Sequence, residues 1–166
     1  MIEEINTDIP SNTNKNIINN LYSSENWYFG WDKNSNKDTD KKDSGFILNL
    51  NNHDNPVLST YAQIIFDIIE KNTFMKFRKI ERIYWNWYHP GSTTEFHYDS
   101  PEHNRYSIIY NLHNNDGGTE FMVDDKVKFI ESKESTAIVF PSKIQHRGIA
   151  PKKNMNRFAL NLMLEI

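Results

Sequence analysis

The sequence predicts a mainly β protein with helices in its N-terminal part, folded as a jelly roll or closed barrel. Two observations predict this class. Before Phe77, apolar residues recur every three or four positions in two segments, as in helices that bury one face. After Phe77, about eight short segments rich in β-branched and aromatic residues alternate with turn signals. Separate hairpins could not bury so much apolar side chain, so we expect the strands to enclose a common core.

Two helices are expected in the N-terminal part. Residues Ser11–Tyr22 follow a proline, begin with a serine suited to the cap position and carry isoleucine and leucine on one face. Residues Val57–Lys71 follow Asn55-Pro56 and show a longer apolar stripe, so this helix should pack against a sheet. Between the two helices, Asp32–Asp43 is polar and aperiodic, which predicts a solvated loop or mobile flap.

The strands expected after Phe77 are short and are separated by turns rich in Pro, Gly, Asn and Asp. They comprise Lys79–His89, Thr93–Tyr98, Arg105–Leu112, Thr119–Val123, Lys126–Glu131, Thr136–Phe140, Gln145–Ile149 and Arg157–Glu165. The turns are expected at Pro90-Gly91, Asn114–Gly118, Asp124-Asp125 and Pro151–Asn154.

The last expected strand has two different faces. Phe158, Leu160, Leu162 and Leu164 alternate on one face, which should pack against an apolar layer. The other face begins with Arg157 and continues with small or polar residues. Such a face suits a barrel interior that holds a charged ligand, so we expect an acidic group near the arginine.

Composition excludes several classes of function. The 166 residues are 37% hydrophobic and 13% aromatic, which excludes a disordered chain and suffices for one domain. Cysteine is absent, so a metal must be bound by His, Asp or Glu. A formal net charge of -3 makes nucleic acid an unlikely partner. No apolar run approaches the roughly 18 residues of a membrane span, and the N-terminus is acidic, so we expect a soluble, cytoplasmic protein with no membrane partner.

Three residues are candidate metal ligands. His97 and Asp99 share one strand face because they are two positions apart, and His146 can supply a third ligand. Two imidazoles and a carboxylate on one face of an octahedron leave three positions open, as in non-haem Fe(II) oxygenases. Arg157 could then hold the far end of a metal-bound dicarboxylate by two parallel hydrogen bonds.

These residues belong to a longer pattern, which resembles the Fe(II)- and 2-oxoglutarate-dependent dioxygenases and particularly their small prolyl-4-hydroxylase-like branch. The resemblance runs from about Ile80 to the C-terminus, roughly half of the chain, and its motifs match in order and spacing. They are Arg82-x-x-x-Asn86-x-Tyr88-x-Pro90-Gly91, His97-x-Asp99, Arg105-Tyr106-Ser107-Ile108-Ile109-Tyr110-Asn111-Leu112, Gly117-Gly118-Thr119-Glu120-Phe121, Val139-Phe140-Pro141, His146 and Arg157.

The resemblance implies a double-stranded β-helix, the cupin-like form of the jelly roll. It also implies that His97, Asp99 and His146 bind iron, with no catalytic residue beyond these metal ligands. Arg157 would bind the 5-carboxylate of 2-oxoglutarate. The residues expected to line the same co-substrate pocket are Tyr88, Asn86, Ser107 and Asn111, the last of which stands where several relatives have a tyrosine.

The function that the resemblance implies is hydroxylation of an unactivated C–H bond, with a prolyl residue in a peptide or protein as the leading substrate and small molecules as others. Fe(II), 2-oxoglutarate and dioxygen would be required, with ascorbate as an optional reductant. We expect residues 1–166 to form a single oxygenase domain, in which 1–77 supply the helical support and the flap and 78–166 the β-helix core.

Two other functions stay open. A cupin-like metal enzyme could use the same three ligands without 2-oxoglutarate, but Arg157 would then be superfluous. A non-catalytic jelly-roll binding domain, with its metal absent or structural, would not turn over 2-oxoglutarate.

Other prominent residues have ordinary structural interpretations. Four further histidines are expected at the surface or with polar partners: His53, His89, His103 and His113. Gly117-Gly118 taken alone would be only a hairpin turn. Trp85 and Trp87 alternate with Asn86 and Tyr88 and should pack against the helices. The aromatic residues Trp27, Tyr28, Phe29 and Trp31 could form either core or a substrate wall.

Overall fold

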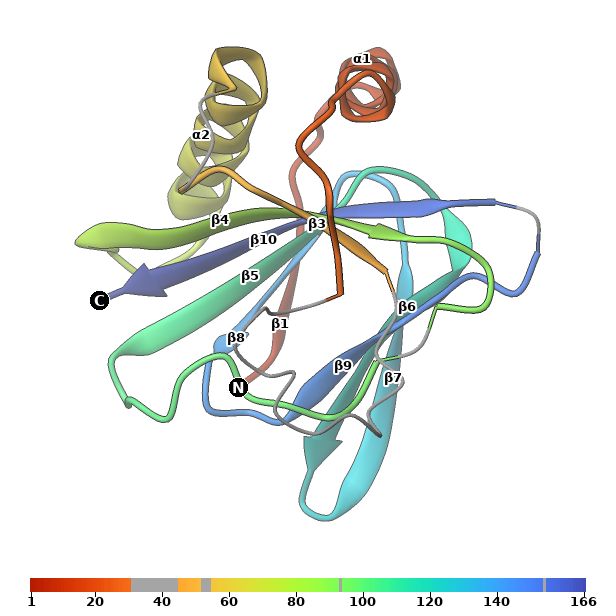
Figure 1. Ribbon diagram of the computed structural model, residues 1–166. Coiled ribbons are helices and arrows are strands. Elements are labelled where there is room, and N and C mark those ends of the chain that lie inside the picture. Colours follow the sequence, from red (N-terminus) through yellow and green to blue (C-terminus); the bar gives the residue numbers. More distant parts are fainter. Residues whose placement is uncertain (31–44, 52–54, 93, 154) are drawn as a thin grey trace.

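Two antiparallel β-sheets form the protein, and two helices pack on the outer face of the larger sheet (Figure 1). The computed structural model describes residues 1–30, 45–51, 55–92, 94–153 and 155–166. Its elements are β1 (Glu3–Asn6), α1 (Ser11–Tyr22), β2 (Tyr28–Phe29), β3 (Phe46–Asn49), α2 (Pro56–Asn72), β4 (Lys79–Tyr88), β5 (Arg105–Asn111), β6 (Asn115–Val123), β7 (Lys126–Ser132), β8 (Thr136–Pro141), β9 (His146–Ile149) and β10 (Arg157–Glu165).

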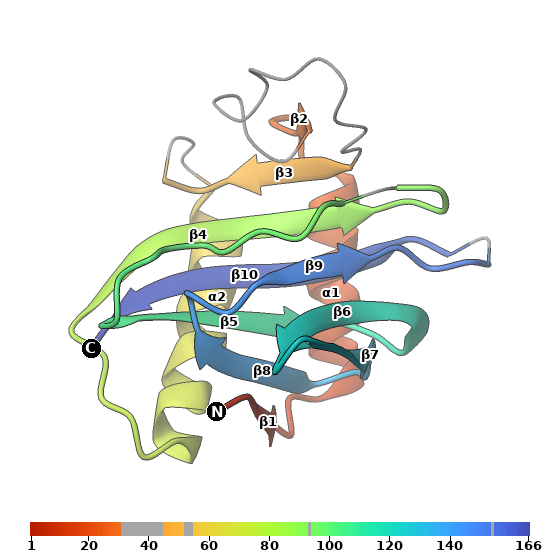
Figure 2. The ribbon, with the colours of Figure 1, turned by 90° about the horizontal axis from the view of Figure 1, so that it is seen from below.

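The larger sheet has seven strands in the order β1-β8-β5-β10-β4-β3-β2, and the smaller sheet has three in the order β7-β6-β9. Figure 2 shows the smaller sheet on one side of the larger one and the helices on the other. β10 lies in the middle of the larger sheet, where it pairs with β4 and β5. The predicted class, a mainly β jelly roll with N-terminal helices, is confirmed.

The two faces of β10 differ as the sequence predicts. The main core lies between the larger sheet and the helices, and it contains Phe158, Leu160, Leu162 and Leu164 together with Ile17, Leu21, Ile65 and Ile69 of the helices. On the opposite face Arg157, Ala159 and Asn161 are buried toward the smaller sheet. A second, smaller cluster around Phe121 and Phe140 packs there. The inward face of β10 therefore forms part of the space between the sheets.

Both helices form where the sequence predicts them. α1 has the predicted bounds, and α2 extends one residue further at each end. The side-chain oxygen of Asn55 caps α2 by accepting a hydrogen bond from the N–H of Leu58 at 3.1 Å. A buried polar contact ties α1 to β5, because the Tyr110 hydroxyl donates to Asn14 Oδ1 at 2.7 Å. No helix in the described part of the chain is long and apolar enough to cross a membrane.

The tryptophans of β4 face the helices, as predicted. Trp85 is fully buried in the main core. Trp87 lies 5.6 Å from the ring centres of both Trp27 and Phe158. Trp27 therefore packs with the core, whereas the side chain of Phe29 is exposed at the sheet edge. Trp31 and the predicted flap, 32–43, lie outside the described residues.

The strand expected over Thr93–Tyr98 is wrong. Among the described residues of this segment, only His97 forms a bridge, which pairs it with His146 of β9. Two main-chain bonds between His97 and His146 form this bridge, and side-chain contacts lie beside it: the Thr94 hydroxyl donates to Gly148 O at 2.5 Å, and His97 Nδ1 lies 3.0 Å from Glu95 O. The segment follows β9 without becoming a strand.

The turn expected at Asn114–Gly118 is also wrong, because β6 begins at Asn115 and Gly117-Gly118 lie inside it. A Cβ atom on Gly118 would lie 2.8 Å from the ring of Phe129 on β7, so the close approach of the two strands requires glycine. The turn predicted at Asp124-Asp125 joins β6 to β7, and both residues have positive φ, 50° and 58°.

Candidate active site

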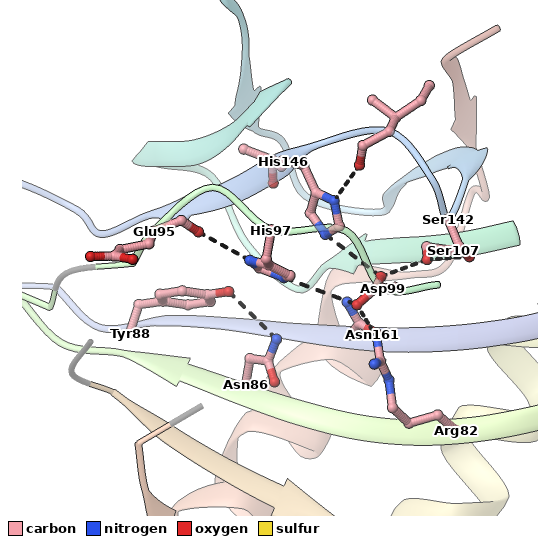
Figure 3. Close-up of polar contacts among 12 residues, drawn as sticks. Arg82, Asn86, Tyr88, Glu95, His97, Asp99, Ser107, Ser142, His146 and Asn161 are labelled. Atoms are coloured by element: carbon pink, nitrogen blue, oxygen red, sulfur yellow. Dashed lines mark hydrogen bonds and ion pairs between the residues drawn. The ribbon is translucent and has the colours of Figure 1, made fainter. Parts of the chain in front are cut away.

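The three predicted metal ligands lie together between the sheets (Figure 3). His97 and Asp99 come from the segment before β5, and His146 begins β9. One ligand atom from each residue lies within 4.8 Å of the others. Nε2 of His97 is 4.0 Å from Asp99 Oδ1, and Nε2 of His146 is 3.6 Å from Asp99 Oδ2. Both imidazoles thus turn the same nitrogen toward one carboxylate.

Main-chain bonds hold this segment against β9. The N–H of His97 donates to the carbonyl of His146 at 3.0 Å, and the N–H of His146 donates back at 2.8 Å. The N–H of Asp99 donates to the carbonyl of Ser142 at 3.0 Å. Each imidazole places Nδ1 at 3.0 Å from a carbonyl oxygen, that of Glu95 for His97 and that of Ile144 for His146. A proton on Nδ1 satisfies these carbonyls and leaves the Nε2 lone pair for a metal.

The charge states of the cluster suit a cation. Burial raises the pKa of Asp99, but the Arg82 guanidinium, His146 and the Ser107 hydroxyl together lower this pKa to about 2. Burial lowers the pKa of His146, and Asp99 offsets only part of that effect. At neutral pH the cluster therefore presents a carboxylate and a neutral buried imidazole, the forms that bind metals. The second imidazole, of His97, is 52% exposed and opens the site to solvent.

The donor set fits iron. Two imidazoles and one carboxylate, without thiolate, form the three-ligand arrangement that leaves open positions on Fe(II). The half-exposed His97 marks the open side of the cluster, whereas His146 packs against the ring of Phe140 at 4.7 Å between centres. The cluster can hold a divalent metal that remains accessible to small molecules.

Arg157 is buried at the start of β10, where 1% of it is exposed. Its Nη2 donates to Asn111 Oδ1 at 3.2 Å and to Thr119 Oγ1 at 3.3 Å. Its Cζ lies 4.7 Å from the centre of the Tyr88 ring. Nε and Nη1 have no hydrogen-bond partner among the described residues. The acidic group expected near this arginine is not supplied by the described part of the chain.

A buried guanidinium whose N–H groups lack partners lowers the stability of the fold unless a bound ligand accepts their hydrogen bonds. Burial lowers the pKa of Arg157 and raises the pKa of Tyr88 beside it, which reflects the dry surroundings of both groups. The N–H groups of Nε and Nη1 remain as charge-assisted donors that oxygen atoms of a bound carboxylate could satisfy. The residues at this end of the space between the sheets therefore fit an organic acid.

Comparison with solved structures identifies the fold, although no protein-family model and no curated protein sequence matches this chain. A Pseudomonas putida prolyl-4-hydroxylase superposes with a TM-score of 0.67 at 12% identity, covering 99% of this chain and 91% of the other. A Trichoplax adhaerens prolyl hydroxylase, solved with a peptide fragment of hypoxia inducible factor, gives 0.73 at 17% identity, covering 99% and 83%. The fold is that of the 2-oxoglutarate and Fe(II) oxygenases. It also includes SnoN, an epimerase of nogalamycin biosynthesis, at a TM-score of 0.74 and 9% identity, covering 99% and 78%.

Within this oxygenase fold, the structure divides the four predicted pocket residues between two places. Tyr88 and Asn111 contact Arg157, and Asn86 Nδ2 donates to the Tyr88 hydroxyl at 3.4 Å while its Oδ1 has no described partner. Ser107 lies at the other end, where its hydroxyl donates to Asp99 Oδ2 at 2.6 Å. Ser107 therefore contacts a candidate metal ligand and not the arginine.

Three further residues contribute to the site although the sequence analysis assigned no function to them individually. Arg82 pairs with Asp99, Thr119 accepts a hydrogen bond from Arg157, and Gly148 faces Tyr88. Strand alternation was a usable signal for Arg82, which shares its face of β4 with Asn86 and Tyr88. The other two depend on how β6 and β9 lie over the larger sheet.

The remaining histidines behave as structural residues in the described part of the chain. His113 Nε2 lies 2.7 Å from the carbonyl oxygen of Asn156, and exposed His103 lies 2.9 Å from Lys143 Nζ. His89 lies beside Phe46, with the ring centres 6.0 Å apart. His53 falls outside the described residues.

Gly148→Ala should destabilise the protein by displacing Tyr88. A Cβ at this position would lie 2.6 Å from Tyr88 Cζ, and the buried ring cannot move without disturbing Arg157. Overpacking of this kind typically costs about 1–3 kcal/mol in the free energy of unfolding, which urea denaturation measures. Gly148→Ala should lower the free energy of unfolding less in a Tyr88→Leu background than in the wild-type protein. Equal costs in both backgrounds would show that the ring is not the obstacle.

Proposed function

We propose that this protein is an Fe(II)- and 2-oxoglutarate-dependent oxygenase that hydroxylates an unactivated C–H bond of a prolyl residue in a peptide or protein. The observation that carries the proposal is the pairing of a His-Asp-His cluster with a buried arginine that has two unused donors. Ser107 and Asn111 stand four residues apart on β5, about 13 Å along a strand, and they contact Asp99 and Arg157 respectively. A single strand thus connects the metal end of the site to the carboxylate end.

In this proposal His97, Asp99 and His146 hold Fe(II), and the Arg157 guanidinium binds the 5-carboxylate of 2-oxoglutarate. Tyr88, Asn86 and Asn111 surround the same carboxylate end. When bound, iron and 2-oxoglutarate supply the oxidising chemistry, in which the co-substrate becomes succinate and carbon dioxide and one oxygen atom of dioxygen enters the substrate.

The residues of the chain position the reactants and exclude water. The pKa of Asp99 is about 2, so its side chain is an ionised carboxylate at neutral pH. This negative charge would offset part of the charge of the bound cation. His146 and Phe140 close the inner side of the cluster, while half-exposed His97 borders the open side. The open side is where we place the substrate, because an exposed entrance admits a peptide and a buried one does not.

The prolyl substrate is favoured by two observations. The motifs from β4 to β10 resemble the prolyl-4-hydroxylase-like branch. Several solved structures that share the fold are prolyl hydroxylases, and one of them was solved with a peptide fragment. An epimerase of nogalamycin biosynthesis has the same fold, so the substrate has to be tested directly and not taken from the fold.

The test is release of succinate from 2-oxoglutarate by the Fe(II)-loaded protein with ascorbate, in the presence of proline-containing peptides, matched peptides with alanine for proline, and free amino acids. We expect the proline peptides alone to raise succinate release and to gain the mass of one oxygen atom. Product formed without consumption of 2-oxoglutarate would favour the cupin-like alternative. An iron-loaded protein that releases no succinate with any substrate would contradict the proposal and favour a binding domain.

A further inference from the structure

Arg82 makes a direct polar contact with the candidate metal centre. It lies on β4, and its Nη2 donates to Asp99 Oδ1 in an ion pair (Figure 3). The same nitrogen donates to Asn161 Oδ1 of β10 at 2.9 Å. Its Cζ lies 4.8 Å from the centre of the Tyr84 ring. Contacts with two neighbouring strands, β4 and β10, thus hold the guanidinium in place independently of its bond to Asp99.

The other oxygen of Asp99 is held independently. The Ser107 hydroxyl donates to Oδ2 at 2.6 Å, and Ser107 Oγ lies 2.8 Å from Ser142 Oγ. The Asp99 side chain is 4% exposed, so few other orientations are open to it. One hydrogen-bond donor on each oxygen therefore sets the plane of the Asp99 carboxylate. The two imidazoles approach this carboxylate from the start of β9 and from the segment before β5.

We infer that Arg82, held by Asn161, is a positioning residue that fixes the orientation of the Asp99 carboxylate for metal binding. The inference rests on the proposed function, which makes Asp99 a metal ligand. Arg82 comes from the strand that also carries Asn86 and Tyr88, so one strand contributes to both ends of the site. Arg82 would act through Asp99 and would not contact the substrate.

Charge alone predicts the opposite effect from positioning. A guanidinium beside the cluster repels a divalent cation and competes for the carboxylate oxygen, so its removal should strengthen metal binding. Positioning predicts weaker binding, because an unfixed carboxylate must be ordered when the metal arrives. The sign of the change in metal affinity therefore separates the two explanations.

The experiment measures the dissociation constant of Mn(II) in the absence of 2-oxoglutarate, from the electron paramagnetic resonance signal of free Mn(II). The proteins compared are wild type, Arg82→Gln, Arg82→Lys, Asn161→Ala, His97→Ala and the control Arg78→Gln. Arg78 precedes β4, and its side chain is 77% exposed, so Arg78→Gln makes the same change in charge away from the site. Thermal unfolding of the metal-free proteins checks that each variant is folded.

We expect Arg82→Gln to weaken Mn(II) binding roughly 10- to 100-fold, the usual effect of removing a partner of a metal ligand. Arg82→Lys should recover part of this loss, since it keeps a donor and the charge. Asn161→Ala should weaken binding less than Arg82→Gln, and Arg78→Gln should not change it. The visible spectrum of bound Co(II) should change in Arg82→Gln and stay unchanged in Arg78→Gln.

Unchanged or tighter Mn(II) binding by Arg82→Gln would overturn the inference while leaving the proposed function intact. If Arg82→Gln does not fold, Arg82→Lys and Asn161→Ala decide in the same way, and wild-type affinity in both overturns it. If the wild-type protein binds Mn(II) no more tightly than His97→Ala does, the assignment of the metal ligands is wrong. That result would contradict both the proposed function and the inference about Arg82.

Discussion

His97→Ala is expected to abolish 2-oxoglutarate turnover and high-affinity metal binding while leaving a folded protein. It removes one of the three proposed metal ligands, and the half-exposed imidazole contributes little to the core. Asp99→Ala and His146→Ala should abolish turnover too. His146→Ala should also lower stability, because this ring packs against Phe140.

The measurements are succinate release and Mn(II) binding for each variant, with circular dichroism to show that the fold is kept. His103→Ala is the matched control, since His103 is exposed and contacts Lys143, not the metal cluster. We expect it to retain wild-type turnover. Full activity in any of the three ligand variants would refute the assignment of that residue.

Arg157→Ala is expected to weaken binding of 2-oxoglutarate roughly 30-fold to several thousandfold. Truncating one partner of a buried, hydrogen-bonded charge pair typically costs about 2 to 5 kcal/mol, and about 1.4 kcal/mol is a tenfold change in affinity. Arg157→Lys should recover part of the loss, because the charge remains but the planar pair of donors does not. Metal binding should hardly change, because Arg157 contacts β5 at Asn111, whereas Asp99 contacts the same strand four residues away at Ser107.

Calorimetric titration of 2-oxoglutarate into the Mn(II)-loaded proteins measures this effect. Arg147→Ala is the control, because its guanidinium already pairs with Glu120 at 2.7 Å. An unchanged dissociation constant in Arg157→Ala would move the carboxylate anchor elsewhere and would favour the cupin-like alternative.

Much of the fold could be predicted because its signals are local. The stripe of α1 and the alternation of β10 each follow from the side chains of one segment. The strands β1, β2 and β3 were not predicted, since they have four, two and four residues and are stabilised by pairing with distant strands. The segment at 93–98 has the composition of a strand, but its described residues pair with β9 through one isolated bridge, His97 to His146, with a side-chain bond from Thr94 beside it.

The residues of the candidate site were likewise predictable where their signal is local in the sequence. The pair His97 and Asp99 follows from their spacing, and Arg157 from its place on an alternating strand. The contact between Arg82 and Asp99 joins residues 17 positions apart, and it depends on the register that brings Asn161 beside β4. Ser107 and Asn111 share one face of β5 but contact Asp99 and Arg157 respectively, because strand alternation gives the face of a residue and not the neighbour that it meets there.

The central claim is that one site binds a metal and 2-oxoglutarate together. An anaerobic titration of 2-oxoglutarate into the Fe(II)-loaded protein, followed by visible absorption, tests it most directly. The account predicts a saturable metal-to-ligand charge-transfer band in wild type, its absence in His97→Ala, and a strongly shifted midpoint in Arg157→Ala. A wild-type protein that binds Fe(II) and gives no such band at saturating 2-oxoglutarate would contradict it.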